Sequence, residues 1–342
     1  MKIQLFDKIN SLPDLKAFND TLPVFATQEY ADYLTETRGF KTVWFLGTLT
    51  EKFRFIIPFT IRKKHGFKTG FFQTATVYSD DNIDIESESI FLNEVLSIIK
   101  EKKICDWIEQ PPNWALFRTV PEGSIYCKFG TYRIELSNKS EDELYKNINY
   151  HHKRLINKSI KNDVIVKNGK ELIDDCSTVF TQASKLGNHT LLNEDEIKQL
   201  FNSLPAFVTT FVAYNNSAPK SSIICFSSKW SVYAVFIANT SPNGGENHLL
   251  HWEAIKDAKH RGIRYFDFVG ARMNPLPGSK LEGIQKFKKY FGGALIEGYL
   301  WKMPVSKFKY HLYNILIFLY YIIKFKKYKG DIIDQELKRA GN

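Results

Sequence analysis

The chain has 342 residues, which is enough for two domains of about 150 residues each. Its content of 44% hydrophobic and 15% aromatic residues indicates a globular protein with substantial cores. The net charge of +10 favours anionic partners such as nucleic acid, anionic lipid or phosphorylated substrates, although lysines also serve solubility alone. Four scattered cysteines without a C-x-x-C pair argue against a small disulfide-stapled secreted scaffold and indicate buried thiols in a reducing cytosol. Residues 1–10 contain charges and no long apolar run, so we expect no signal peptide.

The first part of the chain, residues 1–149, is predicted to be a mixed α/β domain. We expect a capped helix at 28–37, strands at 43–48 and 53–61, a basic loop at 62–66, a helix at 86–100, strands at 105–108 and 132–136, and a capping box at 140–143 that opens another helix. The segment 76–81 is polar and turn-prone, and it contains Tyr78 and Asp80.

The second part, residues 150–303, is predicted to form a second α/β domain. It begins with a basic helix at 150–162 that carries Arg154. We then expect a strand at 164–167, helices at 179–186 and 194–204, strands at 211–214, 221–228 and 231–239, a helix at 247–260, a strand at 265–269, a short helix within 283–293 and a strand at 294–300. Asp267 lies in the apolar strand 265–269, where an unpaired charge is costly.

A polar loop at 241–245 joins a predicted strand to the start of a predicted helix. Its Gly244 and Gly245, followed by Asn247, offer backbone N–H groups to an anion or a carbonyl oxygen. His248, at the start of the helix, is a candidate general base, with packing as the alternative. His251 follows one turn later, but this H-x-x-H spacing brings no third ligand, so we expect no metal.

The tail, residues 304–342, contains the most apolar run of the chain at 310–323. This run is shorter than the roughly 20 residues that span a bilayer, and lysines precede and follow it. Two interpretations stay open: an apolar helix at a membrane interface, and a helix that packs on the protein core.

The order of motifs in the second domain resembles the acyltransferase superfamily with the GNAT fold, and more narrowly the FemABX peptidoglycan aminoacyltransferases. The resemblance is carried by residues 244–252, by 265–270 around Asp267, and by the pair Phe287-Lys288 followed by Phe291-Gly292. The basic segment 152–159 is similar to the helix that opens the second half of such proteins. The resemblance spans about residues 25–300 and implies an α+β fold of two tandem GNAT-like modules, each a mixed sheet flanked by helices, plus a C-terminal apolar helix.

The resemblance also implies roles for individual residues. Lys288, with Phe287 beside it, would hold a diphosphate or polarise the acyl carbonyl, and the alternative is a solvated lysine. Asp267 would orient Lys288 or take a proton, or else form a structural ion pair. Arg272 and Lys280 flank a Pro/Gly loop and are candidates for phosphate recognition or plain surface charges. The remaining candidates for substrate contact are Tyr78, Asp80 and Arg154, each with a turn or a solvated helix as the alternative.

We therefore expect an acyltransferase that forms an amide on an amino group of a cell-envelope precursor or a sugar-linked substrate. The amine would attack directly, without a covalent intermediate, and no cofactor is expected beyond the co-substrate. The donor stays open between aminoacyl-tRNA and acyl-CoA. The CoA signature R/Q-x-x-G-x-G/A is not matched, and no long coiled-coil segment of the kind associated with tRNA use is evident.

The expected partners are this acyl donor and an amine acceptor, with lipid- and nucleotide-linked acceptors included. The expected location is the cytoplasm, with peripheral contact to the inner face of the membrane. A rival interpretation is a non-catalytic, basic nucleic-acid- or membrane-binding protein on a degenerate GNAT-like fold, which the charge and the tail also suit.

Overall fold

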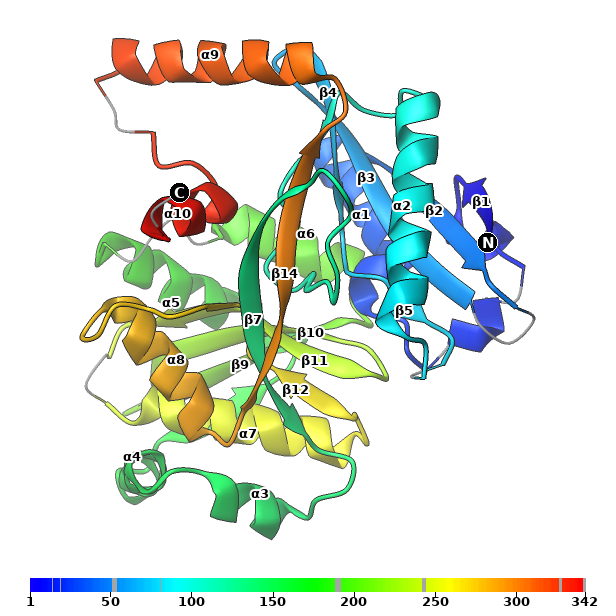
Figure 1. Cartoon of the computed structure of the whole chain (residues 1–342). Coiled ribbons are helices and arrows are strands. Elements are labelled where there is room, and N and C mark those ends of the chain that lie inside the picture. The colour runs from blue at the N-terminus through cyan, green and yellow to red at the C-terminus, as the bar shows by residue number, and fades with distance from the viewer. Residues whose placement is uncertain are drawn as a thin grey trace. The chain divides into compact units, whose positions relative to one another are not determined.

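The computed structural model describes residues 1–13, 15–18, 20–50, 54–80, 82–187, 192–241, 244–325 and 328–340. The chain divides into two compact units. The first unit comprises Met1–Gly130 and Glu297–Asn342, and the second comprises Thr131–Ile296. Strands β7 (Ile125–Glu135) and β14 (Ala294–Pro304) both begin in one unit and end in the other, so the chain passes between the units twice within strands (Figure 1).

The first unit is built on a mixed sheet in which β1 to β4 follow one another as an antiparallel meander. The strands are β1 (Lys2–Phe6), β2 (Lys41–Thr48), β3 (Arg54–Lys64), β4 (Phe67–Phe72), β5 (Val77–Tyr78) and β6 (Trp107–Ile108). Strand β4 pairs with β6 in parallel, β6 pairs with β14 in antiparallel, and β5 pairs with β3. The crossover that a parallel pair needs is the long helix α2 (Ile85–Glu101).

This sheet is buried on both faces, because its strands are apolar at consecutive positions rather than at alternate ones. On β2, Val43 and Phe45 pack with α2, whereas Trp44 and Leu46 pack on the opposite side. That opposite side is covered by α1 (Gln28–Arg38) and by short 3-10 helices. These helices are η1 (Ile9–Ser11), η2 (Leu15–Phe18) and η3 (Val24–Ala26).

The second unit has a sheet in the order β7-β12-β11-β10-β9-β8. Its strands are β8 (Ile165–Asn168), β9 (Val208–Asn215), β10 (Ala218–Ser227), β11 (Ser231–Asn239), β12 (Tyr265–Asp267) and the short β13 (Ala271–Arg272). All neighbours are antiparallel except β11 and β12, which are parallel. The crossover between β11 and β12 is α7 (Glu246–His260).

Helices cover both faces of this second sheet. Helix α7 packs on one face together with α4 (Tyr150–Lys161), and α5 (Ile173–Lys185) packs on the other face beside α6 (Glu194–Ser203) (Figure 1). The 3-10 helix η4 (Lys170–Leu172) precedes α5, and α3 (Glu141–Asn147) begins with the predicted capping box of Ser140 and Glu143. Helix α8 (Lys280–Tyr290) follows β13 and brings Lys288 to the core.

The division of the chain differs from the boundaries predicted from the sequence, 1–149, 150–303 and 304–342. Residues 131–149 belong to the second unit, because Ile134, Leu136 and Leu144 contribute to its core. The tail belongs to the first unit, because Ile333 of helix α10 (Ile332–Arg339) is buried with Phe129. Sequence order alone does not reveal that a strand crosses from one core to another.

Several predicted elements also differ in detail. The predicted basic loop 62–66 is wrong: residues 62–64 continue β3, and His65 and Gly66 form a tight hairpin turn with φ angles of 49° and 83°. Strands β1 and β4, helix α10 and the first two turns of α5 were not predicted. Part of the predicted loop 241–245, Pro242 and Asn243, lies outside the described residues.

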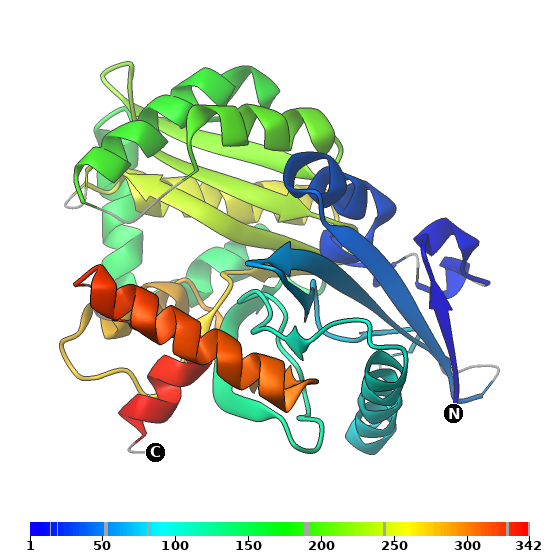
Figure 2. The same ribbon diagram turned by 90° about the horizontal axis from the view of Figure 1, so that it is seen from above.

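The apolar run of the tail forms helix α9 (Lys307–Ile323), which Figure 2 shows from above as one straight helix. A helix cap at Ser306 begins it. Among the helices in the described ranges, none is long and apolar enough to cross a membrane.

Candidate active site

Lys288 is buried, although it stands in a run of lysines. Its neighbours Lys286 and Lys289 are exposed on α8, whereas Lys288 points into the second unit and only 8% of it is exposed. Its ammonium donates hydrogen bonds to the backbone carbonyls of Val269, at 2.6 Å, and Gly270. The lysine that was predicted to be functional is therefore held in a fixed position by the fold.

Burial lowers the pKa of Lys288 to about 8, and the nearby carboxylate of Asp267 limits the fall. At pH 7 the side chain is therefore mostly charged. An ammonium has three N–H donors, and two of them are used by Val269 and Gly270. One donor remains for another oxygen, and a deprotonated amine would have none to spare.

Asp267 does not bond to Lys288 directly. Its carboxylate accepts hydrogen bonds from the Thr131 hydroxyl at 2.5 Å, from Arg133 at 3.0 and 3.1 Å, and from the backbone N–H of Val269 at 2.8 Å. The residue is almost fully buried, and these bonds satisfy its charge. This geometry fits one of the predicted alternatives, a structural ion pair. Through its bond to the N–H of Val269, Asp267 also positions the loop whose carbonyls bind Lys288.

The loop between Asp267 and β13 is strained. Val269 has φ of 53° and Gly270 has φ of 71°, so two consecutive residues are left-handed. This conformation is unfavourable for a β-branched residue such as Val269. Asp267 binds the N–H of Val269 and Lys288 binds its carbonyl, so the two predicted residues act on one peptide segment from opposite ends.

Three histidines near Lys288 form an aromatic cluster, in which His152 and His251 are buried and His248 is half-buried. His152 of α4 and His248 of α7 have ring centroids 4.5 Å apart, and Phe287 of α8 touches both rings. His251 lies between Phe287 and Phe268. The cluster therefore joins α4, α7 and α8 to the strained loop.

Hydrogen bonds define two of these tautomers. The Nδ1 of His251 donates to the Asn247 carbonyl at 2.7 Å, and the Nε2 of His152 donates to the Phe287 carbonyl at 3.1 Å. The other ring nitrogen of each has no partner among the described residues. Burial lowers the pKa to about 4 for His152, about 3 for His248 and about 4 for His251, so all three are neutral at pH 7. Within the described residues, no group of three or more His, Cys, Asp or Glu could hold a metal ion.

The start of α7 is packed rather than open. A Cβ on Gly245 would come within 2.3 Å of the Leu155 carbonyl and of the Ser159 hydroxyl of α4. Close helix packing therefore explains Gly245. The carboxylate of Glu246 is buried in the first turn, where it accepts from Asn215 at 2.8 Å, and this negative charge opposes an anion at the same helix end. Helix packing thus accounts for Gly245, whereas a Cβ on Gly244 would meet the Glu246 carboxylate and the Oδ1 of Asn247 accepts from the Ser221 hydroxyl at 3.3 Å.

Of the other predicted residues, three belong to the second unit and two to the first. Arg154 on α4 and Lys280 at the start of α8 are exposed, and Arg272 in β13 is half-buried, with its carbonyl accepting a bond from Gln285. Tyr78 and Asp80 lie in the first unit. The guanidinium of Arg118 sits 4.3 Å from the ring centre of Tyr78. Asp80 accepts hydrogen bonds from Asn82 in a local turn, as the turn alternative predicts.

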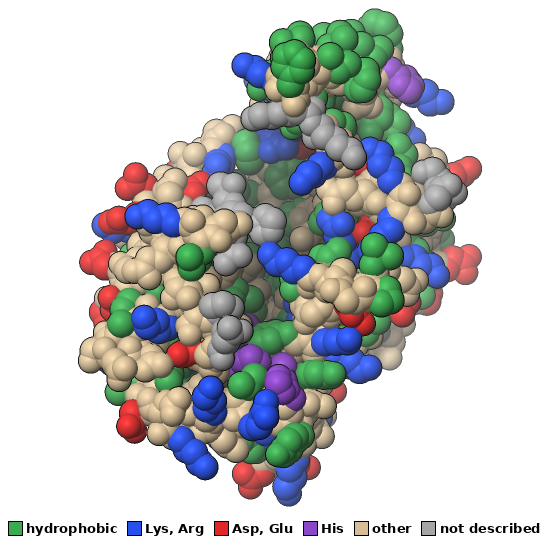
Figure 3. Space-filling view, turned by 90° about the vertical axis from the view of Figure 1, so that its left-hand side faces the viewer, with side chains coloured by type: hydrophobic (Ala, Val, Ile, Leu, Met, Phe, Trp, Pro, Cys, Tyr) green, Lys and Arg blue, Asp and Glu red, His purple; other side chains and the backbone are tan. Residues whose placement is uncertain are grey.

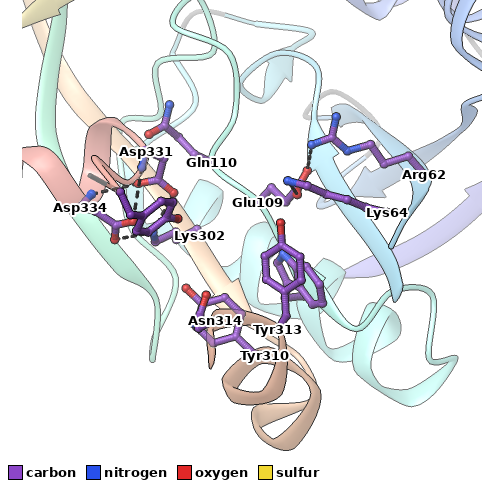
Figure 4. Close-up of a pocket in the computed structure, with 12 residues that line it drawn as sticks. Arg62, Lys64, Glu109, Gln110, Lys302, Tyr310, Tyr313, Asn314, Asp331 and Asp334 are labelled. Carbon is purple, nitrogen blue, oxygen red and sulfur yellow. Dashed lines mark hydrogen bonds and ion pairs between the residues drawn. The ribbon is translucent and has the colours of Figure 1, made fainter. Parts of the chain in front are cut away.

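A cavity of about 260 Å³ in the first unit was not predicted (Figure 4). On one side Lys302 is held by Asp331 at 2.7 Å and by Asp334 at 2.6 Å. On the other side Arg62 and Lys64 pair with Glu109, and tyrosines of α9 complete the wall. Burial opposes the charge of Lys302, but its two carboxylate partners more than compensate and raise its pKa. The cationic side chains of the cavity are therefore paired with carboxylates, and the cavity is neither strongly positive nor strongly negative.

The residues of this cavity come from β3, β6 and the segment after it, β14, α9, and α10 with the segment before it, so no local motif marks them. The one local signal is the spacing of Arg62 and Lys64, which puts both side chains on the same face of a strand. The pair was not predicted, because the run of basic residues at 62–66 indicated a loop.

The chain is similar to known proteins in sequence and in fold. The model of the FemAB family matches residues 245–317, which include α7, the strained loop and α8 with Lys288. No curated protein matches the sequence. Among solved structures, FemX superposes with a TM-score of 0.69 over 91% of this chain and 99% of its own, at 12% identity.

Two further structures are similar at lower scores. The C-terminal domain of a putative lysylphosphatidylglycerol synthetase from Agrobacterium fabrum has a TM-score of 0.50 at 10% identity, over 72% of this chain and 80% of its own. A conserved protein of unknown function from Bacteroides thetaiotaomicron has a TM-score of 0.51 at 11% identity, over 88% and 100%. At these identities the structures show a shared fold. Together with the family match, they confirm the resemblance to FemABX-like acyltransferases with the GNAT fold and indicate that this chain is an acyltransferase.

Proposed function

We propose that the protein joins an acyl group to an amine of a cell-envelope precursor or a sugar-linked substrate, forming an amide, and that Lys288 assists the transfer. The observation that carries this proposal is the buried ammonium of Lys288. It is fixed by two carbonyls, has one donor left, and lies in the segment that the FemAB family model matches. We take both units to be GNAT-like modules, with the transfer chemistry assigned to the second.

In the proposed reaction the amine attacks the carbonyl carbon of an acyl ester or thioester. A C–N bond forms, the bond to the leaving oxygen or sulfur breaks, and the proton lost by the amine balances the one gained by the leaving group. The remaining N–H of Lys288 would stabilise the negative charge that develops on oxygen, at an angle that the carbonyls of Val269 and Gly270 fix beforehand.

Direct attack is favoured over an acyl-enzyme. All four cysteines are buried and form no disulfide. Burial raises the pKa of Cys105 and of Cys225 to about 12, and it also raises that of Cys176, so these thiols are poor nucleophiles at neutral pH. No covalent intermediate on these cysteines is therefore proposed.

The donor is proposed to be an aminoacyl-tRNA or an acyl-CoA, bound as a co-substrate without a further cofactor. Both carry phosphate groups, and the exposed cations Arg154 and Lys280, with the half-buried Arg272, are the proposed contacts. Phe287 is proposed as the apolar neighbour of the acyl group. An acceptor among cell-envelope precursors would place the reaction on the cytoplasmic side of the membrane.

The test is to incubate the purified protein with acyl-CoAs, charged tRNAs and candidate amine acceptors, and to look for amide products by mass spectrometry. The proposal predicts an acceptor whose mass increases by one acyl group with one class of donor. Failure of every donor, together with tight binding to nucleic acid or lipid, would instead favour a non-catalytic binding protein on the same fold.

A further inference from the structure

Helix α9 has two faces of different character. Tyr310, Tyr313, Ile317 and Tyr321 recur at helical spacing and are half-buried against the first unit. On the opposite side lies a stripe of exposed apolar residues, named here the outer stripe. It consists of Phe308, Leu312, Ile315, Leu316, Leu319, Ile322 and Ile323.

The inner face is attached to the first unit by specific contacts. The ring of Tyr313 lies 4.6 Å from that of Trp107 and 5.7 Å from that of Phe67, and Tyr310 also touches Trp107. The ammonium of Lys309 pairs with Asp106 at 2.7 Å. The outer stripe is left open along the length of the helix, and Phe318 and Tyr320 are exposed beside it.

The outer stripe is unusually exposed for its composition. Its side chains are between 39% and 77% exposed, and no residue of α9 is fully buried. The hydrophobic side chains gather on α9 at the top of Figure 3. A contiguous apolar surface of this kind marks an interaction site rather than an ordinary solvated helix.

The charges beside the stripe have a single sign. The sequence from 307 to 330 contains six lysines and no aspartate or glutamate. Lys307 and Lys324 stand at the two ends of the helix and are exposed, whereas Lys326 and Lys327 lie outside the described residues. A long apolar stripe with basic ends matches the interface of an anionic bilayer, where aliphatic side chains enter the acyl boundary and lysines meet the head groups.

We propose that α9 is a membrane-binding surface that lies in the plane of an anionic lipid bilayer, with the outer stripe inserted and the inner face held on the first unit. A second copy of this chain is a poorer occupant, because two such helices would bring their basic ends together without acidic partners. This proposal depends on the exposure of the outer stripe and on the lysines at its ends, and it does not depend on the proposed transfer reaction.

The test uses the full chain and vesicle sedimentation, without substrates. We expect binding to vesicles of phosphatidylcholine with phosphatidylglycerol, and weaker binding to phosphatidylcholine alone. The double variant Leu316→Glu/Leu319→Glu should weaken binding by about a hundredfold or more, since two apolar anchors are lost. The matched control is Ile85→Glu/Ile90→Glu, which alters two exposed isoleucines of α2 by the same charge and should bind like the wild type.

A second pair of variants tests the electrostatic part. Lys307→Gln and Lys324→Gln should each weaken binding to the anionic vesicles by about fivefold, and leave the weaker binding to neutral vesicles unchanged. Circular dichroism melts show whether each variant remains folded. The proposal is overturned if the wild type fails to bind anionic vesicles, or if the outer-stripe variant binds as well as its control. It is also overturned if light scattering shows a dimer that the outer-stripe variant abolishes.

Discussion

At Lys288 the fold holds an ammonium in surroundings that favour the neutral amine. The pKa is about 8 in the native protein, below the ordinary value of 10.5 that the unfolded chain would have. Between these two values the unfolded state binds more protons than the native state, so the free energy of unfolding should rise with pH across pH 8 to 10.5. Below pH 8 the full cost of burying the charge is present.

Lys288→Met removes this titration. Measured by urea unfolding, the stability of the wild type relative to Lys288→Met should increase when the pH is raised from 7.5 to 10. Lys289→Met, at an exposed neighbour, should follow the wild type across the same range. A difference between the wild type and Lys288→Met that stays constant with pH would show that the native pKa of Lys288 is not lowered.

Asp267 and Arg133 form the ion pair beneath the strained loop. Arg133→Met should lower the free energy of unfolding by about 3 kcal/mol, the low end for a buried pair, because the Arg133 side chain is still 29% exposed. Adding Asp267→Asn to this variant should restore much of the loss, since a neutral amide would replace the buried carboxylate that has lost its partner. Equal stability of Arg133→Met and the wild type in urea would contradict the structural role assigned to this pair.

The histidine cluster predicts a loss of stability in mild acid. Each of the three rings has a native pKa of about 4 or below, whereas an unfolded histidine titrates near 6.5. Protons therefore bind the unfolded state first, and stability should fall as the pH drops from 6.5 towards 4. At pH 5 the expected loss is about 2 kcal/mol for His251 alone.

The measurement is urea unfolding at pH 7 and pH 5. His251→Phe should lose less stability between these two values than the wild type does. His311→Phe, at an exposed histidine of α9, should lose as much as the wild type. If His251→Phe and the wild type respond equally to acid, His251 is not the neutral, buried ring described above.

At the scale of elements, two glycines of the second unit make a matched pair. Gly245 lies against the backbone of α4, whereas a Cβ on Gly283 of α8 would meet no atom within 4 Å. Gly245→Ala should destabilise the protein by about 1–3 kcal/mol, as overpacking does. Gly283→Ala should stabilise it by about 1 kcal/mol, because alanine favours the helix interior. Thermal unfolding of both variants measures the contrast, and a neutral Gly245→Ala would show that α4 and α7 are not in close contact.

The elements that sequence reasoning found are those with a strong local pattern. Helices α1, α2 and α7 have apolar residues at helical spacing, and α1 and α2 also have side-chain N-caps; all three lie within a residue or two of their predicted bounds. Strand β4 (Phe67–Phe72) was not predicted because lysine, threonine and glycine interrupt its apolar pattern. Helix α10 was not predicted because most of its residues are polar. The burial of Lys288 could not be read from a run of lysines, since a loop about 20 residues earlier in the chain creates it.

At the scale of the whole molecule, topology was the least predictable feature. The sequence indicated a mixed α/β protein, and the structure has mixed sheets in both units. The predicted boundary at 149 failed because β7 begins in one core and ends in the other, and the tail returns to the first unit to bury Ile333. Contacts between segments far apart in the sequence leave no periodic pattern by which they could be predicted.

The central claim is that Lys288 supplies a hydrogen-bond donor to acyl transfer, and the pH dependence of kcat/KM tests it most directly. With a donor and acceptor identified by mass spectrometry, the wild-type value should fall as the pH rises through about 8, when the spare N–H is lost. At pH 7, Lys288→Ala should be slower by about a hundredfold, while Lys289→Ala keeps wild-type activity. A wild-type kcat/KM that rises through pH 8, or full activity of a folded Lys288→Ala, would contradict the claim.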